Sequence, residues 1–243
     1  MRIYWCLAFV VVFGKLVDGV EGPQKPHKVL LSVYYESRCP DSKEFVLEQL
    51  LPAMQLLHEH VKLQLVPFGK SRSINYGEDG FECQHGPAEC LGNMVQDCAL
   101  NQMRHHSNLD QLAYVACEME SEAGSRGSLE CVRRAGLRTE RVEKCLRTRQ
   151  GTELQLDSEY LTLLMKPKFI PTIAVDALFD QHVQDNALLD LTDTLCAEPA
   201  LENTAPCAQY YNSLAMRHLL TYPLDEEPEN IPLYKYQTYF YID

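Results

Sequence analysis

Four consecutive residues, Cys39-Pro40-Asp41-Ser42, carry the side-chain types needed for thiol–disulfide exchange. They follow an apolar segment and precede one of helical periodicity, which places Cys39 at the start of a helix with Pro40 as its first residue. Unpaired backbone N–H groups and the positive end of the helix dipole favour a thiolate there, and Arg38 and Lys43 add positive charge. Because the thiolate is the species that attacks a disulfide, Cys39 is the candidate nucleophile of a thiol oxidoreductase.

Ser42 stands where a dithiol reductase has its second cysteine. In a C-x-x-C pair the first cysteine attacks the substrate and the second releases it, which a serine cannot do because it has no thiolate. Its hydroxyl can still donate a hydrogen bond to the sulfur of Cys39. The mixed disulfide must then be released by an external thiol such as glutathione or free cysteine. We therefore expect a small-molecule thiol as co-reductant, and no metal or nucleotide cofactor.

Three segments around this tetrapeptide have the pattern of a βαβ unit. Residues 28–36 are apolar with β-branched and aromatic side chains, and residues 61–68 alternate strongly, so both are predicted strands. Residues 43–58 have helical periodicity, and Pro52 is expected to break or kink that helix. Two strands joined by a helix imply parallel pairing with a right-handed crossover.

A further strand is predicted at residues 169–176, and Pro171 lies near its start. In redox folds built from a βαβ unit and a β-hairpin, a cis proline at this point faces the reactive cysteine and leaves backbone groups free to pair with an extended substrate. We therefore expect Pro171 to be cis and to face Cys39. The pattern then predicts a second hairpin strand at 177–183 and helices at 186–196 and 207–220.

Composition and charge exclude several classes of function. The chain has 243 residues and a formal net charge of −12, which disfavours binding to nucleic acid and to anionic membranes. Residues 1–19 have the features of a secretory signal peptide: Arg2, an apolar run at 7–13 and small residues before the cleavage site. No later stretch is apolar enough to span a membrane. The mature chain, starting near residue 20, is therefore expected in an oxidising lumen.

The cysteines predict a disulfide framework with one thiol left over. The chain has ten cysteines, and removal of Cys6 with the signal peptide leaves an odd number. Eight can pair in four bridges, which leaves Cys39 free. Six lie between residues 83 and 145, in a part with a helical pattern, so a disulfide-stapled helical insertion is predicted at about 83–165.

Two other segments lack a clear strand or helix pattern. Residues 70–82 are expected to be a loop. The acidic and aromatic tail at 221–243 is expected to be either a loosely docked terminus or a partner-binding strand.

The segment from residue 83 to residue 98 reads CQHGPAECLGNMVQDC, which is the pattern C-Q-H-G-x2-E-C-x2-N-x4-C. This pattern resembles the signature of the gamma-interferon-inducible lysosomal thiol reductase (GILT) family. The signal peptide, the Cys-Pro pair, the proline-led strand and a Cys-x10-Cys near the C-terminus resemble the family as well, so the resemblance covers roughly residues 28–210. The fixed residues of the signature are Cys83, Gln84, His85, Gly86, Glu89, Cys90, Asn93 and Cys98.

The resemblance implies an α/β, thioredoxin-like domain over residues 20–220, with the disulfide-stapled helical insertion inside it. It also implies reduction of disulfides in protein substrates within acidic endosomes or lysosomes, with roles in antigen processing and in responses to bacteria. Carried over by position, Cys39 is the nucleophile, Pro171 is the cis proline, and Ser42 occupies the resolving position. Cys196 and Cys207 are implied to form a structural disulfide, which their short spacing also favours.

Other interpretations of the same residues stay open. The chain has no N-x-S/T sequon for glycan-based lysosomal sorting, so secretion is as well supported as lysosomal delivery. A secreted binding protein that has lost turnover, or a covalent trap that holds clients as mixed disulfides, would use the same fold. Zinc binding by His85 with the nearby cysteines is disfavoured, because no C-x2-C pair is present and an oxidising lumen favours disulfides. His85 is expected to pack and hydrogen-bond within the signature turn, and the oligomeric state is left open.

Overall fold

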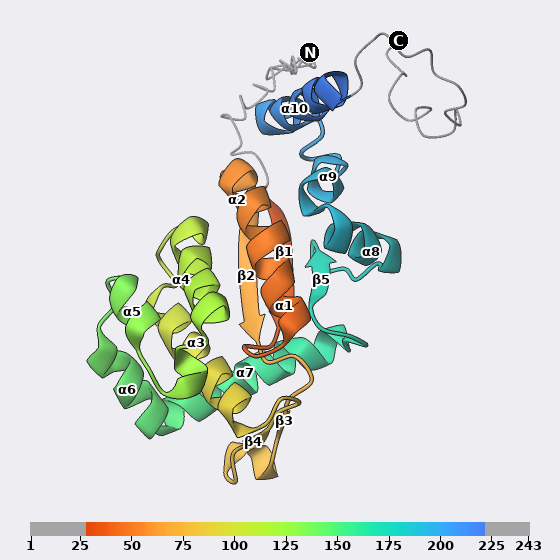
Figure 1. Cartoon of the computed structure of the whole chain (residues 1–243). Coiled ribbons are helices and arrows are strands. Elements are labelled where there is room, and N and C mark those ends of the chain that lie inside the picture. Colours follow the sequence, from red (N-terminus) through yellow and green to blue (C-terminus); the bar gives the residue numbers. More distant parts are fainter. Residues whose placement is uncertain (1–27, 222–243) are drawn as a thin grey trace, which may run out of the picture.

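The computed structural model describes residues 28–221 of the chain (Figure 1). Its central sheet has the strand order β2-β1-β5. β1 (Val29–Tyr35) and β2 (Val61–Pro67) pair in parallel along their full lengths, and β5 (Thr172–Val175) pairs antiparallel with the other edge of β1. The predicted βαβ unit is therefore confirmed. The predicted signal peptide (1–19) and nearly all of the tail (221–243) lie outside the described residues.

The connection between β1 and β2 is one helical run that starts directly after Cys39. It consists of α1 (Pro40–Glu44), a π-helical segment (Phe45–Leu50) and α2 (Leu51–Leu57). Pro52 lies in the first turn of α2, and the wide π turn before it relieves the clash that a proline causes inside a regular α-helix. The run thus begins earlier than the predicted 43–58 and passes the proline without a break.

The helical insertion lies between β2 and β5, as predicted. Figure 1 shows α3 to α6 grouped beside β2, with α7 running back towards β5. The predicted loop at 70–82 contains a short hairpin of β3 (Arg72–Ser73) and β4 (Phe81–Glu82), which the sequence pattern did not predict. The helices are α3 (Pro87–Gln102), α4 (Asn108–Ser121), α5 (Glu130–Arg134), α6 (Thr139–Arg147) and α7 (Arg149–Met165), with 3-10 turns at Asn75–Gly77 and Gly124–Arg126.

The predicted second hairpin strand at 177–183 is wrong. After β5 the chain reverses at Asp176 and Ala177, both of which have positive φ, and only a single β-bridge follows. The side chain of Asp180 then accepts hydrogen bonds from two backbone N–H groups at the start of α8 (Gln181–Leu189). Because this cap satisfies donors that a helix start leaves unpaired, the helix forms where the strand was expected.

The C-terminal part is helical, as predicted, but its boundaries differ. The helix expected at 186–196 is split, because Asp190 ends α8 and its side chain caps α9 (Leu191–Cys196). α10 (Ala205–Thr221) contains the helix predicted at 207–220. Within residues 28–221, no helix is long and apolar enough to cross a bilayer. A βαβ unit, a long helical insertion and an antiparallel strand that opens after a proline make up the thioredoxin-like architecture expected from the sequence.

A buried polar contact joins the insertion's two longest helices. The carboxylate of Asp97 on α3 accepts hydrogen bonds from Gln155 Nε2 at 2.6 Å and from Ser158 Oγ at 2.9 Å, both on α7. Burial raises the pKa of Asp97 from its ordinary 3.8 to about 8, although the two hydrogen bonds lower it. In mildly acidic solution the folded protein therefore holds a proton at Asp97 that the unfolded chain has released.

We expect this carboxyl group to make the protein less stable as the pH rises. Between 3.8 and about 8 the folded state binds more protons at Asp97 than the unfolded state, so the free energy of unfolding decreases with pH across that window. The decrease is at most about 1.4 kcal/mol per pH unit. Asp97→Asn, which stays neutral, should flatten the slope measured by urea unfolding at pH 5 and pH 7. Asp79→Asn, at an exposed position, is the control, and equal slopes in wild type and Asp97→Asn would contradict the assignment.

Candidate active site

Cys39 caps the N-terminus of α1. Its Sγ accepts a hydrogen bond from the Ser42 backbone N–H at 3.4 Å, and its own N–H donates to the Glu36 carbonyl at 3.3 Å. Only 7% of the residue is exposed. The sulfur therefore lies at the unpaired N–H groups of a helix start, as the sequence predicted. It is also almost completely buried.

Cys39 is the one free cysteine among residues 28–221. The other eight cysteines in this range form four disulfides, which is the outcome that the odd count predicted, and Cys6 lies outside the described residues. The expected Cys196–Cys207 bridge joins α9 to α10, far from the start of α1 (Figure 1). The remaining bridges are Cys83–Cys90, Cys98–Cys145 and Cys117–Cys131.

The segment that enters β5 faces this sulfur. The Ile170–Pro171 peptide bond is cis, and the Ile170 carbonyl oxygen lies 3.8 Å from Cys39 Sγ. The thiol can donate to this carbonyl, whereas a thiolate accepts from the Ser42 N–H on its other side. The two sequence-predicted residues Cys39 and Pro171 are therefore brought together, although they are far apart in the chain.

Ser42 is fully buried behind the sulfur. The sequence suggested that its hydroxyl could donate a hydrogen bond to the sulfur of Cys39. In the structure the hydroxyl instead accepts a long hydrogen bond from the Glu36 N–H at 3.4 Å. The backbone N–H of Ser42 supplies the donor to the sulfur instead. This serine therefore helps to close the turn between β1 and α1.

The two basic residues that flank the tetrapeptide both interact with the C-terminal end of α4. Arg38 Nε lies 3.4 Å from Glu122 Oε2, and Lys43 Nζ donates to the Glu120 carbonyl at 3.2 Å. Since Arg38 is paired with a carboxylate, its charge is partly neutralised. The hydrogen bond to the sulfur itself comes from the helix start, through the Ser42 N–H.

The signature residues form the turn that leads into α3 and the first part of that helix. The Cys83–Cys90 disulfide closes the turn, and Gly86 precedes α3 with a left-handed φ of 84°. Gln84 is exposed at the turn. Cys98, the last residue of the signature, forms a disulfide with Cys145 and so joins α3 to α6.

Helix α3 packs directly on the residues between β1 and α1. Asn93 Oδ1 accepts a hydrogen bond from the Ser37 N–H at 2.9 Å, and Ser37 Oγ donates to the Glu89 carbonyl at 3.0 Å. Gly92 permits this approach, because a Cβ there would lie 2.5 Å from Ser37 Oγ and 2.1 Å from Ser125 Oγ. The signature thus supports the turn that presents Cys39.

Asn93→Ala should slow catalysis and destabilise the protein. The substitution leaves the buried Ser37 N–H without its acceptor, which costs about 1–3 kcal/mol. It also loosens the turn that carries the nucleophile, and misplacement on this scale lowers kcat/KM by roughly 10–100-fold. Disulfide reduction and urea unfolding measure the two effects. Asn101→Ala, on the last turn of α3 and partly exposed, is the matched control; equal losses in both variants would contradict a specific role for Asn93.

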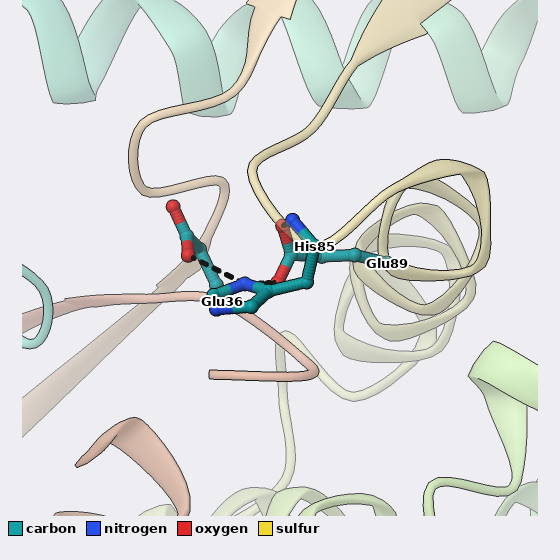
Figure 2. Close-up of side chains that lie close together, drawn as sticks. All are labelled: Glu36, His85 and Glu89. Carbon is teal, nitrogen blue, oxygen red and sulfur yellow. Dashed lines mark hydrogen bonds and ion pairs between the residues drawn. The ribbon is translucent and has the colours of Figure 1, made fainter. Parts of the chain in front are cut away.

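Beside this turn, His85 lies between two buried carboxylates (Figure 2). Its Nδ1 is 2.6 Å from Glu89 Oε2 and 3.3 Å from Glu36 Oε2. His85 therefore does hydrogen-bond within the signature turn. The cysteines considered with it as zinc ligands, Cys83, Cys90 and Cys98, are held in disulfides.

Sequence reasoning missed Glu36, Ser37 and Gly92. Glu36 and Ser37 are fully or almost fully buried, yet they directly follow a buried strand, where polar residues ordinarily turn towards solvent. The sequence did offer one indication of their role: Glu36 and Ser37 are adjacent polar residues shortly before the candidate nucleophile. Gly92, inside the signature segment but not among its fixed residues, gave none.

A free cysteine at a helix start, faced by a cis proline on a thioredoxin-like sheet, defines the class of thiol–disulfide oxidoreductases. The family model described as gamma interferon inducible lysosomal thiol reductase (GILT) matches residues 30–147. A fruit fly relative, GILT-like protein 1 of Drosophila melanogaster, is 31% identical over 206 residues, which are 75% of this chain and 80% of the relative. The chain belongs to the GILT family.

Other similar proteins come from mosquito and fish. The gamma-interferon-inducible lysosomal thiol reductase-like protein of Anopheles gambiae is 33% identical over 70% of this chain and 76% of its own length. The gamma-interferon-inducible lysosomal thiol reductase of Carassius auratus is 30% identical over 74% of this chain and 72% of its own. Among solved structures, the oxidoreductase DsbA of Xylella fastidiosa has a TM-score of 0.46 at 15% identity, over 69% of this chain and 84% of that one.

Proposed function

We propose that this protein reduces disulfide bonds in protein substrates by a monothiol mechanism, with Cys39 as the nucleophile. One observation carries the proposal: the free cysteine at the helix start has its sulfur 3.8 Å from the Ile170 carbonyl, beside the cis proline. Membership in a family named for thiol reductases supports the same reaction class. Ser42 gives the reaction its monothiol character, because a serine cannot resolve a mixed disulfide.

The reaction consists of successive thiol–disulfide exchanges. The Cys39 thiolate attacks one sulfur of the substrate disulfide, and the other substrate sulfur leaves as a thiolate and takes up a proton. An external thiolate then attacks Cys39 Sγ in the mixed disulfide and releases the second substrate thiol. A second external thiol frees Cys39 and leaves as a small-molecule disulfide. One substrate disulfide is thus reduced while two external thiols are oxidised.

The residues around the sulfur have distinct roles in this scheme. The Ser42 N–H stabilises the thiolate when Cys39 attacks or leaves. The Ile170 carbonyl next to Pro171 offers an extended substrate a backbone acceptor close to the sulfur. No metal or nucleotide takes part in any of these steps.

The compartment proposed for this activity is the secretory pathway, with the endosomal or lysosomal lumen and the extracellular space as destinations. Four disulfides among the described residues fit an oxidising compartment. Relatives named as lysosomal thiol reductases support the lysosome, and unfolding of disulfide-bonded proteins for proteolysis is the role that we propose there. A part in the immune response to bacteria is proposed on family membership alone.

The proposed function is tested by the reduction of insulin disulfides at pH 5 and pH 7 with free cysteine or glutathione as co-thiol. We expect a rate that saturates with insulin and increases with the co-thiol concentration. Protein whose free cysteine has been alkylated after partial unfolding and refolding is the control, and it should be inactive. No rate above that of the co-thiol alone at either pH would overturn the proposal.

A further inference from the structure

We propose that Glu36, His85 and Glu89 form a binding site for a divalent transition-metal ion, with Zn²⁺ as the best-fitting candidate. Three ligand atoms, one from each residue, lie within 4.8 Å of one another. They come from the end of β1, from the signature turn and from α3 (Figure 2). This site is separate from the thiol chemistry of Cys39 and does not rest on the proposed function.

The two carboxylates are fixed in similar ways. Glu36 Oε1 accepts from the Lys70 N–H at 2.6 Å, and Glu89 Oε1 accepts from the His85 N–H at 3.0 Å. Each carboxylate therefore uses one oxygen to bind the backbone and directs the other, Oε2, towards the imidazole. A ligand set whose orientation is already fixed by hydrogen bonds to the protein is typical of metal sites.

One of these oxygens lacks a hydrogen-bond partner. Glu36 is fully buried, and its Oε2 accepts no hydrogen bond from the described residues. Gly69 makes room for this side chain: it has a left-handed φ of 59°, and a Cβ there would lie 2.3 Å from Glu36 Cγ. A buried carboxylate oxygen without a donor is costly, and a cation between Oε2 and His85 would satisfy it.

The charges of the cluster also fit a divalent ion. Glu36 and Glu89 are both fully buried, and the imidazole is the one basic side chain within ion-pair distance of either carboxylate among the described residues. Two buried negative charges are neutralised by one divalent ion bound to a neutral imidazole.

The geometry suits four-coordinate Zn²⁺. Zinc binds imidazole nitrogen and carboxylate oxygen at about 2.0–2.2 Å, which places neighbouring tetrahedral ligand atoms about 3.3 Å apart. The distance from His85 Nδ1 to Glu36 Oε2 is 3.3 Å, whereas that to Glu89 Oε2 is 2.6 Å and must lengthen for an ion to bind between the two atoms. The His85 side chain is 32% exposed, so a water molecule can complete the coordination from that side.

The test is a Zn²⁺ titration of purified protein carrying Cys39→Ser, so that the free thiol binds no metal. After removal of metal with a chelator, we expect one Zn²⁺ per chain at neutral pH. His85→Ala and Glu36→Gln should each weaken Zn²⁺ binding by about tenfold or more. Substitution of residues that only hydrogen-bond to metal ligands already lowers metal affinity by about 10–100-fold, and these two residues are proposed as ligands themselves. His105→Ala, at an exposed histidine of the insertion, is the matched control and should bind like the parent.

Substituting Co²⁺ reports the donor atoms. We expect visible d–d bands of a four- or five-coordinate ion without the sulfur-to-cobalt charge-transfer band of a thiolate ligand. Near-UV circular dichroism checks that each variant is folded; Glu36→Gln, which removes a buried charge while keeping the shape of the side chain, decides the question if His85→Ala misfolds. Absence of stoichiometric binding, binding unchanged in Glu36→Gln, or binding lost in His105→Ala would overturn the site.

Discussion

Cys39→Ser is expected to lower the rate of protein disulfide reduction to that of the external thiol alone, a loss of about 10³-fold or more. The serine preserves the size of the side chain and its place at the helix start, but a hydroxyl does not form the anion that attacks sulfur near neutral pH. No other free cysteine is present among residues 28–221 to replace it. The measurement is insulin reduction with glutathione, at matched concentrations of wild type and variant.

The same substitution separates the three functions that the sequence left open. A monothiol reductase loses its rate, a covalent trap loses the mixed disulfide with its client, and a binding protein keeps its partner. Equal unfolding free energies of wild type and Cys39→Ser would show that the thiol, and not the fold, had been changed. Full activity in Cys39→Ser would mean that the nucleophile has been assigned to the wrong residue.

The free cysteine at the start of α1 could be found from the sequence because its evidence is local. An apolar strand, a Cys-Pro pair and a helical pattern stand next to one another in the chain, and each constrains Cys39. The odd number of cysteines after signal removal gave a second, independent argument for the same residue. The position of Pro171 could not be predicted from local sequence alone. Its approach to Cys39 depends on strand β5 pairing with β1, a long-range contact that was inferred from the fold class.

The surroundings of the sulfur could not be predicted in the same way. That Asn93 holds the Ser37 N–H, and that His85 lies against Glu36, depends on how α3 packs on the end of β1. Periodicity shows that a helix has a buried face but not which strand end it covers. The predicted strand at 177–183 failed for a different reason: apolar residues there suggested pairing, while the side-chain cap at Asp180 favoured a helix.

These contacts give the family signature a structural meaning for this chain. Glu89 contacts the nucleophile's turn through its carbonyl, and Asn93 does so through its side chain. His85 reaches the same turn through Glu36, whose carbonyl accepts from the Cys39 N–H. The signature therefore bears on the position of the turn that carries the sulfur, whereas the hydrogen bonds of the sulfur itself are made with Ser42 and Ile170.

Ser42→Cys is expected to convert the monothiol centre into a dithiol centre. Residue 42 lies three positions after Cys39 on the first helical turn, and its backbone nitrogen is already 3.4 Å from the sulfur. Residues three apart on a helix have Cβ atoms about 5–6 Å apart, close enough for a disulfide to form with a small adjustment. A thiol at this position can attack Cys39 Sγ in a mixed disulfide and release the substrate without any external thiol.

A single-turnover experiment isolates this step. Pre-reduced protein is mixed with a disulfide substrate in the absence of co-thiol, and the mixed disulfide is quantified over time after acid quenching. A cysteine held within the same chain acts at an effective concentration in the millimolar range or higher. Because the other protein molecules supply thiols at only micromolar concentration, the mixed disulfide of Ser42→Cys should decay about 10³-fold faster than that of wild type. In wild type and in the control Ser42→Ala it should persist, because neither has a second thiol. Equal lifetimes in all three proteins would show that residue 42 cannot reach the sulfur, and that the buried serine closes the turn without occupying a resolving position.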